Sequence, residues 1–174
     1  CSITNNSVNQ SPLLIHDMAM VVVANTSLVG NSGTKAGAII NTKTALASQT
    51  IQIVNTLIIR NWGLETAGIM NTGNLHIDNS ILWDNRLYNY LLPPNTPGVD
   101  ILLQSPGLTL VEPIVRNTIT QAYGVNSNAR THSSLFGADP LFTDMYGGDY
   151  SLQPGSPAIN AGDNNFYNAA LLGT

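Results

Sequence analysis

Short stretches in which hydrophobic and polar residues alternate recur along the first half of the chain. Residues 21–24, 51–54 and 75–78 are rich in Val, Ile and Leu, and an asparagine follows each of them directly. Period-two alternation with β-branched residues is typical of strands. No segment carries a helical stripe of apolar residues beyond two turns. We therefore expect an all-β protein.

A repeated phrase follows each stretch: asparagine, a small residue, any residue, Ile or Leu, two residues and a closing asparagine. It occupies residues 25–31, 55–61 and 79–85, and residues 1–6 fit it without the leading asparagine. The repeat units span 24 to 30 residues and resemble three short strands each. A unit of this size cannot bury an apolar face alone, so the units should stack in register. The repeat predicts a right-handed parallel β-helix (β-solenoid) of about four coils.

Stacking in register places matching residues of successive units about 4.8 Å apart. Three apolar ladders and one ladder of small residues should then point inward. They are Ile3–Leu28–Ile58–Leu82, Val21–Ile51–Leu75, Val23–Ile53–Ile77 and Cys1–Thr26–Thr56–Ser80. Asparagine, present 21 times, suits the turns because it tolerates left-handed backbone, and its amides can pair from coil to coil.

The pattern loosens after Asn85. Residues 86–98 indicate a loop inserted between strands, residues 99–103, 108–111 and 114–119 indicate an irregular fourth coil, and residues 124–134 a polar loop. We expect coils over residues 1–134 and an irregular C-terminal capping segment over 135–174, with Phe142 and Tyr150 among the residues that plug the open end of the core. A strand edge left open at Cys1 indicates a fragment of a longer chain.

Three phrases near the C-terminus carry a resemblance to a known family. They are Ala-Asp-Pro-Leu-Phe at 138–142, Gly-Asp-Tyr-Ser-Leu at 148–152 and Gly-Ser-Pro-Ala-Ile-Asn-Ala-Gly at 155–162. This tail resembles the ending of the choice-of-anchor Q domain, a secreted β-helix domain of bacterial surface proteins, and the repeats resemble those of bacterial parallel β-helices. The resemblance implies an extracellular, surface-attached bacterial protein, and it implies no catalytic activity.

Composition excludes several classes of function. Only 9% of residues are charged and the formal net charge is −4, so six scattered Lys and Arg residues make no surface for nucleic acid. The longest strongly apolar run, residues 18–24, is far shorter than the ~20 residues of a membrane-spanning helix. One cysteine excludes an internal disulfide, and the tail aspartates match no calcium-loop spacing. We expect no cofactor and no metal.

Aromatic residues supply the main candidate binding site. Trp83 aligns with Val29 and Ile59 at an outward strand position, and Tyr88 and Tyr90 follow shortly after. An exposed apolar column of this kind often marks a contact surface, here for a sugar face or a protein partner. The alternative is that the loop over residues 88–99 folds back and covers the column.

Charged residues supply a second candidate. Arg60 and Asp84 occupy matching positions of adjacent units, where they form either a substrate-binding charge pair or an exposed cross-coil ion pair worth about 0–1 kcal/mol. His76 aligns with outward-facing Gln52 and Val22, which fits a solvated side chain better than a general base. Asp78 and Asp84 are six residues apart across a turn, too far apart to serve as the carboxylate pair of a glycosidase.

Three functions follow from these observations. The first is a non-enzymatic extracellular surface module, adhesin-like or a stalk, that contacts a glycan or a surface protein. The second is part of a polysaccharide lyase or glycoside hydrolase whose catalytic coils lie upstream. The third is a structural unit of a surface fibre, assembled by end-to-end self-association through open strand edges.

Overall fold

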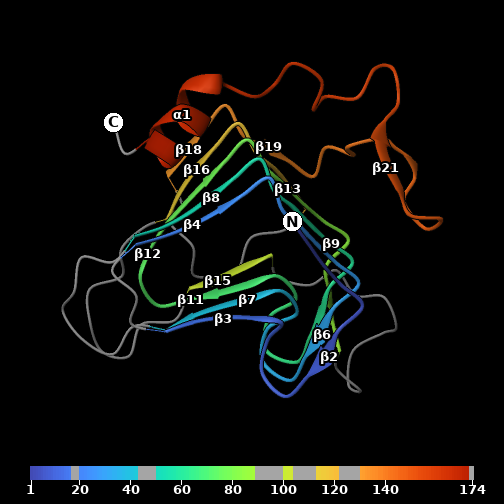
Figure 1. Ribbon diagram of the computed structural model, residues 1–174. Coiled ribbons are helices and arrows are strands. Elements are labelled where there is room, and N and C mark those ends of the chain that lie inside the picture. Colours follow the sequence, from blue (N-terminus) through green and yellow to red (C-terminus); the bar gives the residue numbers. More distant parts are fainter. Residues whose placement is uncertain (17–19, 43–49, 89–99, 104–112, 122–129, 173–174) are drawn as a thin grey trace.

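The computed structural model describes residues 1–16, 20–42, 50–88, 100–103, 113–121 and 130–172. Strands dominate these residues, and most of them belong to four parallel sheets that surround a common core (Figure 1). The all-β prediction is confirmed.

Each sheet is built from strands that lie far apart in the sequence. Sheet A holds β1 (Ser2–Thr4), β5 (Ser27–Val29), β9 (Leu57–Ile59), β13 (Ile81–Trp83), β17 (Ile119–Thr120) and β19 (Leu135–Phe136). Sheet B holds β2 (Ser7–Val8), β6 (Ser32–Gly33), β10 (Trp62–Gly63) and β14 (Arg86–Leu87). Sheet C holds β3 (Leu13–His16), β7 (Ile39–Thr42), β11 (Ile69–Asn71) and β15 (Ile101–Leu103). Sheet D holds β4 (Met20–Ala24), β8 (Thr50–Val54), β12 (Asn74–Asp78), β16 (Ile114–Arg116) and β18 (Arg130–His132).

From β4 to β15 the chain visits the sheets in the fixed order D, A, B, C, and each strand from β4 to β13 pairs in parallel with the strand one pass later. A full pass therefore contains four strands where the repeat predicted three. The additional strands are those of sheet B. They are only two residues long, so they show no alternation that the sequence could reveal.

The predicted inward ladders form the core. Leu28 pairs in register with Ile58, which pairs with Leu82, and all three are fully buried. The Val21 and Val23 ladders lie in register in sheet D and belong to the same core cluster. Cys1 is an exception, because it is exposed rather than packed inside. It precedes β1, the edge strand of sheet A, and no further strand among the described residues covers it.

A buried amide ladder, made by the closing asparagines Asn31, Asn61 and Asn85, joins successive passes. The N–H and Nδ2 of Asn31 both donate to Oδ1 of Asn61 at 3.0 Å, and those of Asn61 donate to Oδ1 of Asn85 at 3.1 and 3.0 Å. Asn85 Nδ2 donates to Asp100, whose buried carboxylate also accepts from Thr120 Oγ1 and the N–H of Gln121. The predicted coil-to-coil pairing of asparagines is confirmed here.

A second set of asparagines stands at the outer corner between sheets D and A. Asn25, Asn55, Asn79 and Asn117 adopt left-handed backbone with φ between 47° and 49°. This is the conformation that asparagine tolerates best among residues with a side chain, so the predicted turn role is confirmed. We call this set the corner asparagines.

Three segments differ from their predicted structure. The predicted loop over residues 86–98 begins as strand β14, and the predicted polar loop over 124–134 contains β18. The first pairs with β10 and the second with β16. Both segments therefore pair with a neighbouring strand although their sequences show no strand pattern. The predicted strand over 108–111 lies outside the described residues.

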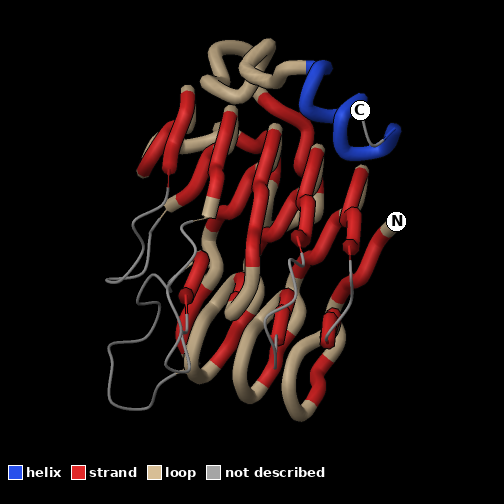
Figure 2. The backbone as a smooth tube through the Cα atoms, turned by 90° about the vertical axis from the view of Figure 1, so that its left-hand side faces the viewer, coloured by secondary structure: helices blue, strands red, loops and turns tan. Residues whose placement is uncertain are grey.

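The C-terminal segment does not plug the end of the core. Leu135 and Phe136 still form β19 of sheet A, and only the following residues, 137–172, leave the sheets; we call these the tail. The tail contains the hairpin of β20 (Phe142–Asp144) and β21 (Asp149–Leu152) and the helix α1 (Asn164–Leu172). Figure 2 shows the tail running outside the stacked strands, from the later strands back toward the end where the N-terminus lies.

Contacts with three different passes hold the tail against the outside of the sheets. Arg60 Nη1 donates to the carbonyl of Met145, Asn79 pairs with Asp163, and Asn25 Nδ2 donates to the Tyr167 hydroxyl at 2.7 Å. Helix α1, which the sequence pattern did not predict, begins after Asp163, whose carboxylate accepts from the N–H of Asn165 at 2.9 Å.

Candidate functional site

The outer face of sheet A carries the predicted apolar column. Val29 and Ile59 lie in register there, but they are 6% and 0% exposed. Apolar side chains of the tail pack over the column and form one cluster with it, chiefly Phe142, Met145, Tyr150, Leu152 and Ala158. The column is thus covered from within the molecule by the tail. Residues 89–99 of the loop that the sequence suggested as a cover lie outside the described residues.

The structure describes two of the three residues of the predicted aromatic platform and places them in or beside different sheets. Trp83 lies half-buried in the packing between sheet A and the tail. Tyr88 is 51% exposed but follows β14 in sheet B, and Tyr90 lies outside the described residues. Sequence alignment placed Trp83 outward correctly, yet it could not show that a remote segment returns to cover this position.

Arg60 and Asp84 do not pair with each other, and each contacts a different residue. Asp84 forms an ion pair with Arg86 at 2.7 Å, two residues along the chain. The Arg60 guanidinium stacks on Tyr146, with its carbon 4.9 Å from the ring centroid, and donates to the Met145 carbonyl at 3.3 Å. Arg60 and Asp84 do share the outward left-handed corner between sheets A and B, with φ values of 55° and 52°.

A cleft of about 570 Å³ lies where this corner meets the turn of the β20–β21 hairpin. Three aromatic side chains, Trp62, Tyr146 and Tyr150, line it together with Arg60 and small polar residues that include Ser2, Thr4 and Ser27. We call it the arginine–aromatic cleft. Its walls come from three successive passes and from the tail, so only the folded molecule creates it.

The charge of this cleft is distinctive. Among the described residues Arg60 has no carboxylate partner, whereas Arg86 and Arg116 pair with Asp84 and Asp78. Arg60 is also the only charged residue that lines the cleft among those described. The cleft therefore combines one uncompensated positive charge with aromatic faces, which suits an anionic ligand that has apolar surface.

Trp62 is the residue of this cleft that sequence reasoning missed. It directly follows the repeat asparagine Asn61, at a position where other units carry Ser32 and Arg86. The Arg86 guanidinium lies 5.7 Å from the Trp62 ring centroid, and Arg86 Nη2 lies 3.4 Å from the Tyr146 hydroxyl. The sequence did contain a signal for this site, because Trp62 is a tryptophan at a position where the matching residues of other units are polar.

A third polar cluster joins sheet D to α1. Asp78 is 3% exposed and accepts two hydrogen bonds from Arg116, at 2.5 and 2.8 Å. The Arg116 guanidinium in turn lies 3.8 Å from the ring centroid of Phe166. Burial lowers the pKa of neighbouring His76, and Arg116 lowers it further while Asp78 opposes the change. Arg116 thereby links Asp78 of sheet D to Phe166 of α1.

No protein-family model, curated protein or solved structure matches this chain. The described part of the chain holds no group of three or more His, Cys, Asp or Glu residues arranged to bind a metal ion. Within the same residues, no helix is long and apolar enough to cross a membrane. Function is therefore inferred from the surface chemistry of the molecule itself.

Proposed function

We propose that this chain is a right-handed parallel β-helix of about four coils that acts as a non-enzymatic, adhesin-like module on a bacterial cell surface and binds an acidic saccharide in the arginine–aromatic cleft. The fixed order of parallel strands supports the β-helix. The phrases at 138–162, which resemble the choice-of-anchor Q ending, support an extracellular, surface-attached location.

The positions of the carboxylates support a binding role over an enzymatic one. Seven of the ten acidic residues accept hydrogen bonds that hold turns, corners or the helix end. They are Asp78, Asp84, Asp100, Asp139, Asp144, Asp149 and Asp163. A glycosidase requires two carboxylates directed at one substrate, about 5–10 Å apart. Here these carboxylates accept from backbone N–H groups, from an arginine, or from the side chains of neighbouring Asn, Ser and Thr residues.

The proposal rests chiefly on the hydrogen-bond donors of Arg60. A guanidinium has five N–H donors, and Arg60 uses one of them on the Met145 carbonyl. The remaining donors suit a carboxylate, which a guanidinium binds in two parallel hydrogen bonds. Trp62 and the two tyrosines offer apolar faces for the C–H side of a sugar ring. The cleft volume of 570 Å³ is within the usual range of small-ligand sites.

Calorimetric titration of the purified protein with a galacturonic acid tetrasaccharide tests this function. The methyl ester of the same tetrasaccharide is the matched neutral probe, and it should bind at least tenfold more weakly. Arg60→Asn should remove the preference for the acid while keeping the backbone, because asparagine tolerates the left-handed conformation found at position 60. Lys35→Asn removes the same charge from an exposed position outside the cleft and should change nothing.

Equal affinity for the acid and the ester, or an unchanged preference in the Arg60→Asn protein, would overturn the proposed site. The same samples also test the non-enzymatic role. The tetrasaccharide should keep its length after prolonged incubation with the protein, and shortened products would instead assign an activity.

A further inference from the structure

The arginine–aromatic cleft carries its charge at one end only. Asn5, Gly30 and Arg60 line it from matching positions of three successive passes, because the N–H of Asn5 donates to the Val29 carbonyl and that of Gly30 to the Ile59 carbonyl. The backbones of Asn5 and Arg60 are thus two strand spacings apart, about 10 Å. Among the described residues, the lining near Asn5 is polar and uncharged.

The outer face of sheet A changes from apolar to polar where the cleft opens. Ser2 and Ser27 lie in register with Leu57 and Ile81 of the later passes. Leu57 and Ile81 belong to the apolar cluster that the tail covers, whereas Ser2 and Ser27 line the cleft together with Thr4. The tail therefore leaves a group of hydroxyl side chains open next to Asn5.

Gly30 leaves a gap between Asn5 and Arg60. The three residues share a left-handed backbone, with φ values of 54°, 66° and 55°, but only the middle one has no side chain. A Cβ atom on Gly30 would lie 2.5 Å from Asn5 Oδ1, so the Asn5 carboxamide extends over the glycine. Among the described residues this carboxamide has no hydrogen-bond partner. The gap thus has an open amide at its edge.

We propose that the cleft binds an acidic sugar joined to a neutral sugar, with the carboxylate on Arg60 and the neutral sugar over Gly30. This inference rests on the proposed function. The distance between Asn5 and Arg60 exceeds the length of one pyranose ring, so a ligand that reaches both contains at least two sugars. Asn5 and the nearby hydroxyl groups donate and accept hydrogen bonds, as sugar hydroxyls do.

The distribution of charge selects a neutral second sugar. Arg60 is the only cation among the described lining residues, and it serves the first carboxylate. A second carboxylate over Gly30 would lose water without gaining a positive partner, which is unfavourable. A chain in which every sugar is acidic therefore fits the cleft less well than a mixed one.

Calorimetric titration with α-1,4-linked disaccharides of galacturonic acid and galactose tests the inference. Both orders of the two sugars are used, because the cleft sets the position of the acid and not the direction of the chain. Digalacturonic acid has the same linkage and a second carboxylate. The tighter of the two mixed disaccharides should bind about fivefold more tightly than digalacturonic acid and about tenfold more tightly than galacturonic acid alone.

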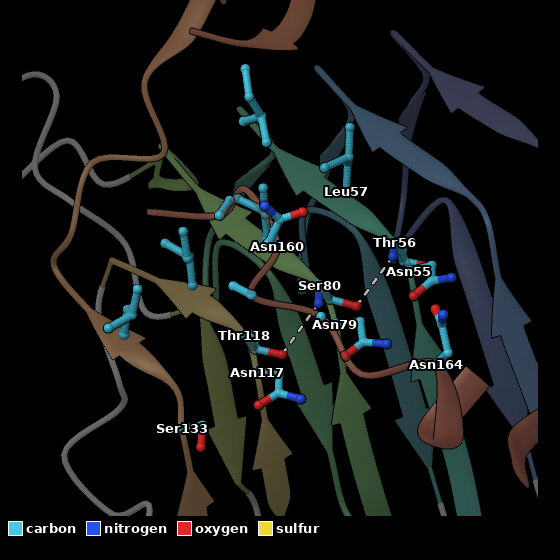
Figure 3. A pocket seen from close by; sticks show the side chains of 17 residues that line it. Asn55, Thr56, Leu57, Asn79, Ser80, Asn117, Thr118, Ser133, Asn160 and Asn164 are labelled. Atoms are coloured by element: carbon cyan, nitrogen blue, oxygen red, sulfur yellow. Dashed lines mark hydrogen bonds between the residues drawn. The ribbon is translucent and has the colours of Figure 1, made fainter. Parts of the chain in front are cut away.

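Variants in the gap separate the two sugars. Asn5→Gly keeps the left-handed backbone and removes the carboxamide, so it should weaken the mixed disaccharide about fivefold and leave galacturonic acid unaffected. Gly30→Asn fills the gap at a φ that asparagine tolerates and should have the same selective effect. Asn117→Gly is the matched control, because Asn117 is also left-handed but lines a separate hollow that shares no residue with the cleft (Figure 3).

The outcomes distinguish this inference from the proposed function. Mixed disaccharides that bind no more tightly than galacturonic acid would overturn the inference, even where the acid depends on Arg60. Tighter binding of digalacturonic acid than of both mixed disaccharides would overturn it too, and so would an equal loss for the single sugar and the disaccharide in Asn5→Gly. Failure of all these acids to bind would instead overturn the proposed function.

Discussion

Sheets A to D repeat the same contacts on each pass of the chain, whereas the tail makes each of its contacts once. In the sheets, every buried asparagine amide has an equivalent one pass away, and the core ladders extend through the whole stack. The tail is attached by an apolar cluster on sheet A and by single polar contacts at Asn25, Arg60, Asn79 and Arg116. Stability in the first region is collective, and in the second it is local.

The difference matters for function because the proposed site requires both regions. Tyr146 and Tyr150 of the tail complete the arginine–aromatic cleft. The sheets alone would retain Arg60 but would lose one wall of the cleft. A variant that releases the tail should therefore abolish saccharide binding while the sheets stay folded.

The largest effect is expected from breaking the buried amide ladder. Asn61→Ala leaves the carbonyl of Leu28, the N–H of Asn31 and Oδ1 of Asn85 with fewer partners inside the core. Buried polar groups without partners cost about 1–3 kcal/mol each, so urea unfolding should show a loss of about 4 kcal/mol. Asn6→Ala, at the exposed end of the same ladder, should cost under about 1 kcal/mol. Equal losses would contradict a collective ladder.

A smaller and more local effect is expected in the tail cluster. Phe142 is buried between the hairpin and sheet A, and it contacts the Tyr150 ring edge-on with a centroid separation of 5.8 Å. Phe142→Ala should cost about 3 kcal/mol of tail attachment. Limited proteolysis should then cleave within residues 137–163 first and leave the sheets intact. Ile159→Ala, at an exposed tail position, is the matched control and should not accelerate cleavage.

The paired hydrogen bonds of Asn79 allow a sharper comparison within one column. Asn79→Gly and Asn117→Gly make the same change at left-handed positions, but only Asn79 holds the tail. The difference between the two losses in free energy of unfolding should be about 1–2 kcal/mol, the value of two hydrogen bonds. Identical losses would show that the Asn79–Asp163 pair contributes nothing to attachment of the tail.

The smallest effect concerns pH. Burial lowers the pKa of His76, beside Asp78 and Arg116, so below about pH 6.5 the unfolded chain takes up a proton before the folded one does. Stability should therefore fall as the pH drops from about 6.5 toward the lower pKa of the folded state. His76→Gln, which copies Gln52 at the paired position of β8, should reduce this dependence. A steeper dependence in the variant would contradict the assigned direction.

The sequence predicted the repeated part of the molecule well, because each ladder position recurs at a recognisable interval. Leu28, Ile58 and Leu82 could be placed inside, and the asparagine turns could be recognised, from the repeat alone. Sheet B was missed because two residues per strand carry no periodicity. The course of the tail was missed because its contacts join distant residues without any repeat. Asn79 and Asp163 are 84 positions apart, and Asn25 and Tyr167 are 142 apart.

The candidate site was predicted only in part for the same reason. Arg60 was identified from its place in the repeat, but its partners Tyr146 and Met145 come from the tail. Trp83 was predicted as a contact residue because it is aromatic and faces outward, but the same tail covers it. A residue's direction follows from strand alternation, whereas what covers that residue depends on the whole chain.

The two tryptophans provide the most direct test of the central claim that the tail and sheet A together form a binding cleft. Trp62 lines the arginine–aromatic cleft, and Trp83 lies in the packing beneath the tail. The measurement is tryptophan fluorescence during titration with the galacturonic acid tetrasaccharide, in the Trp83→Phe and Trp62→Phe proteins. We expect a saturable change when Trp62 is the only tryptophan and none when Trp83 is. A change that follows Trp83 instead, or no change in either protein, would contradict the proposed cleft.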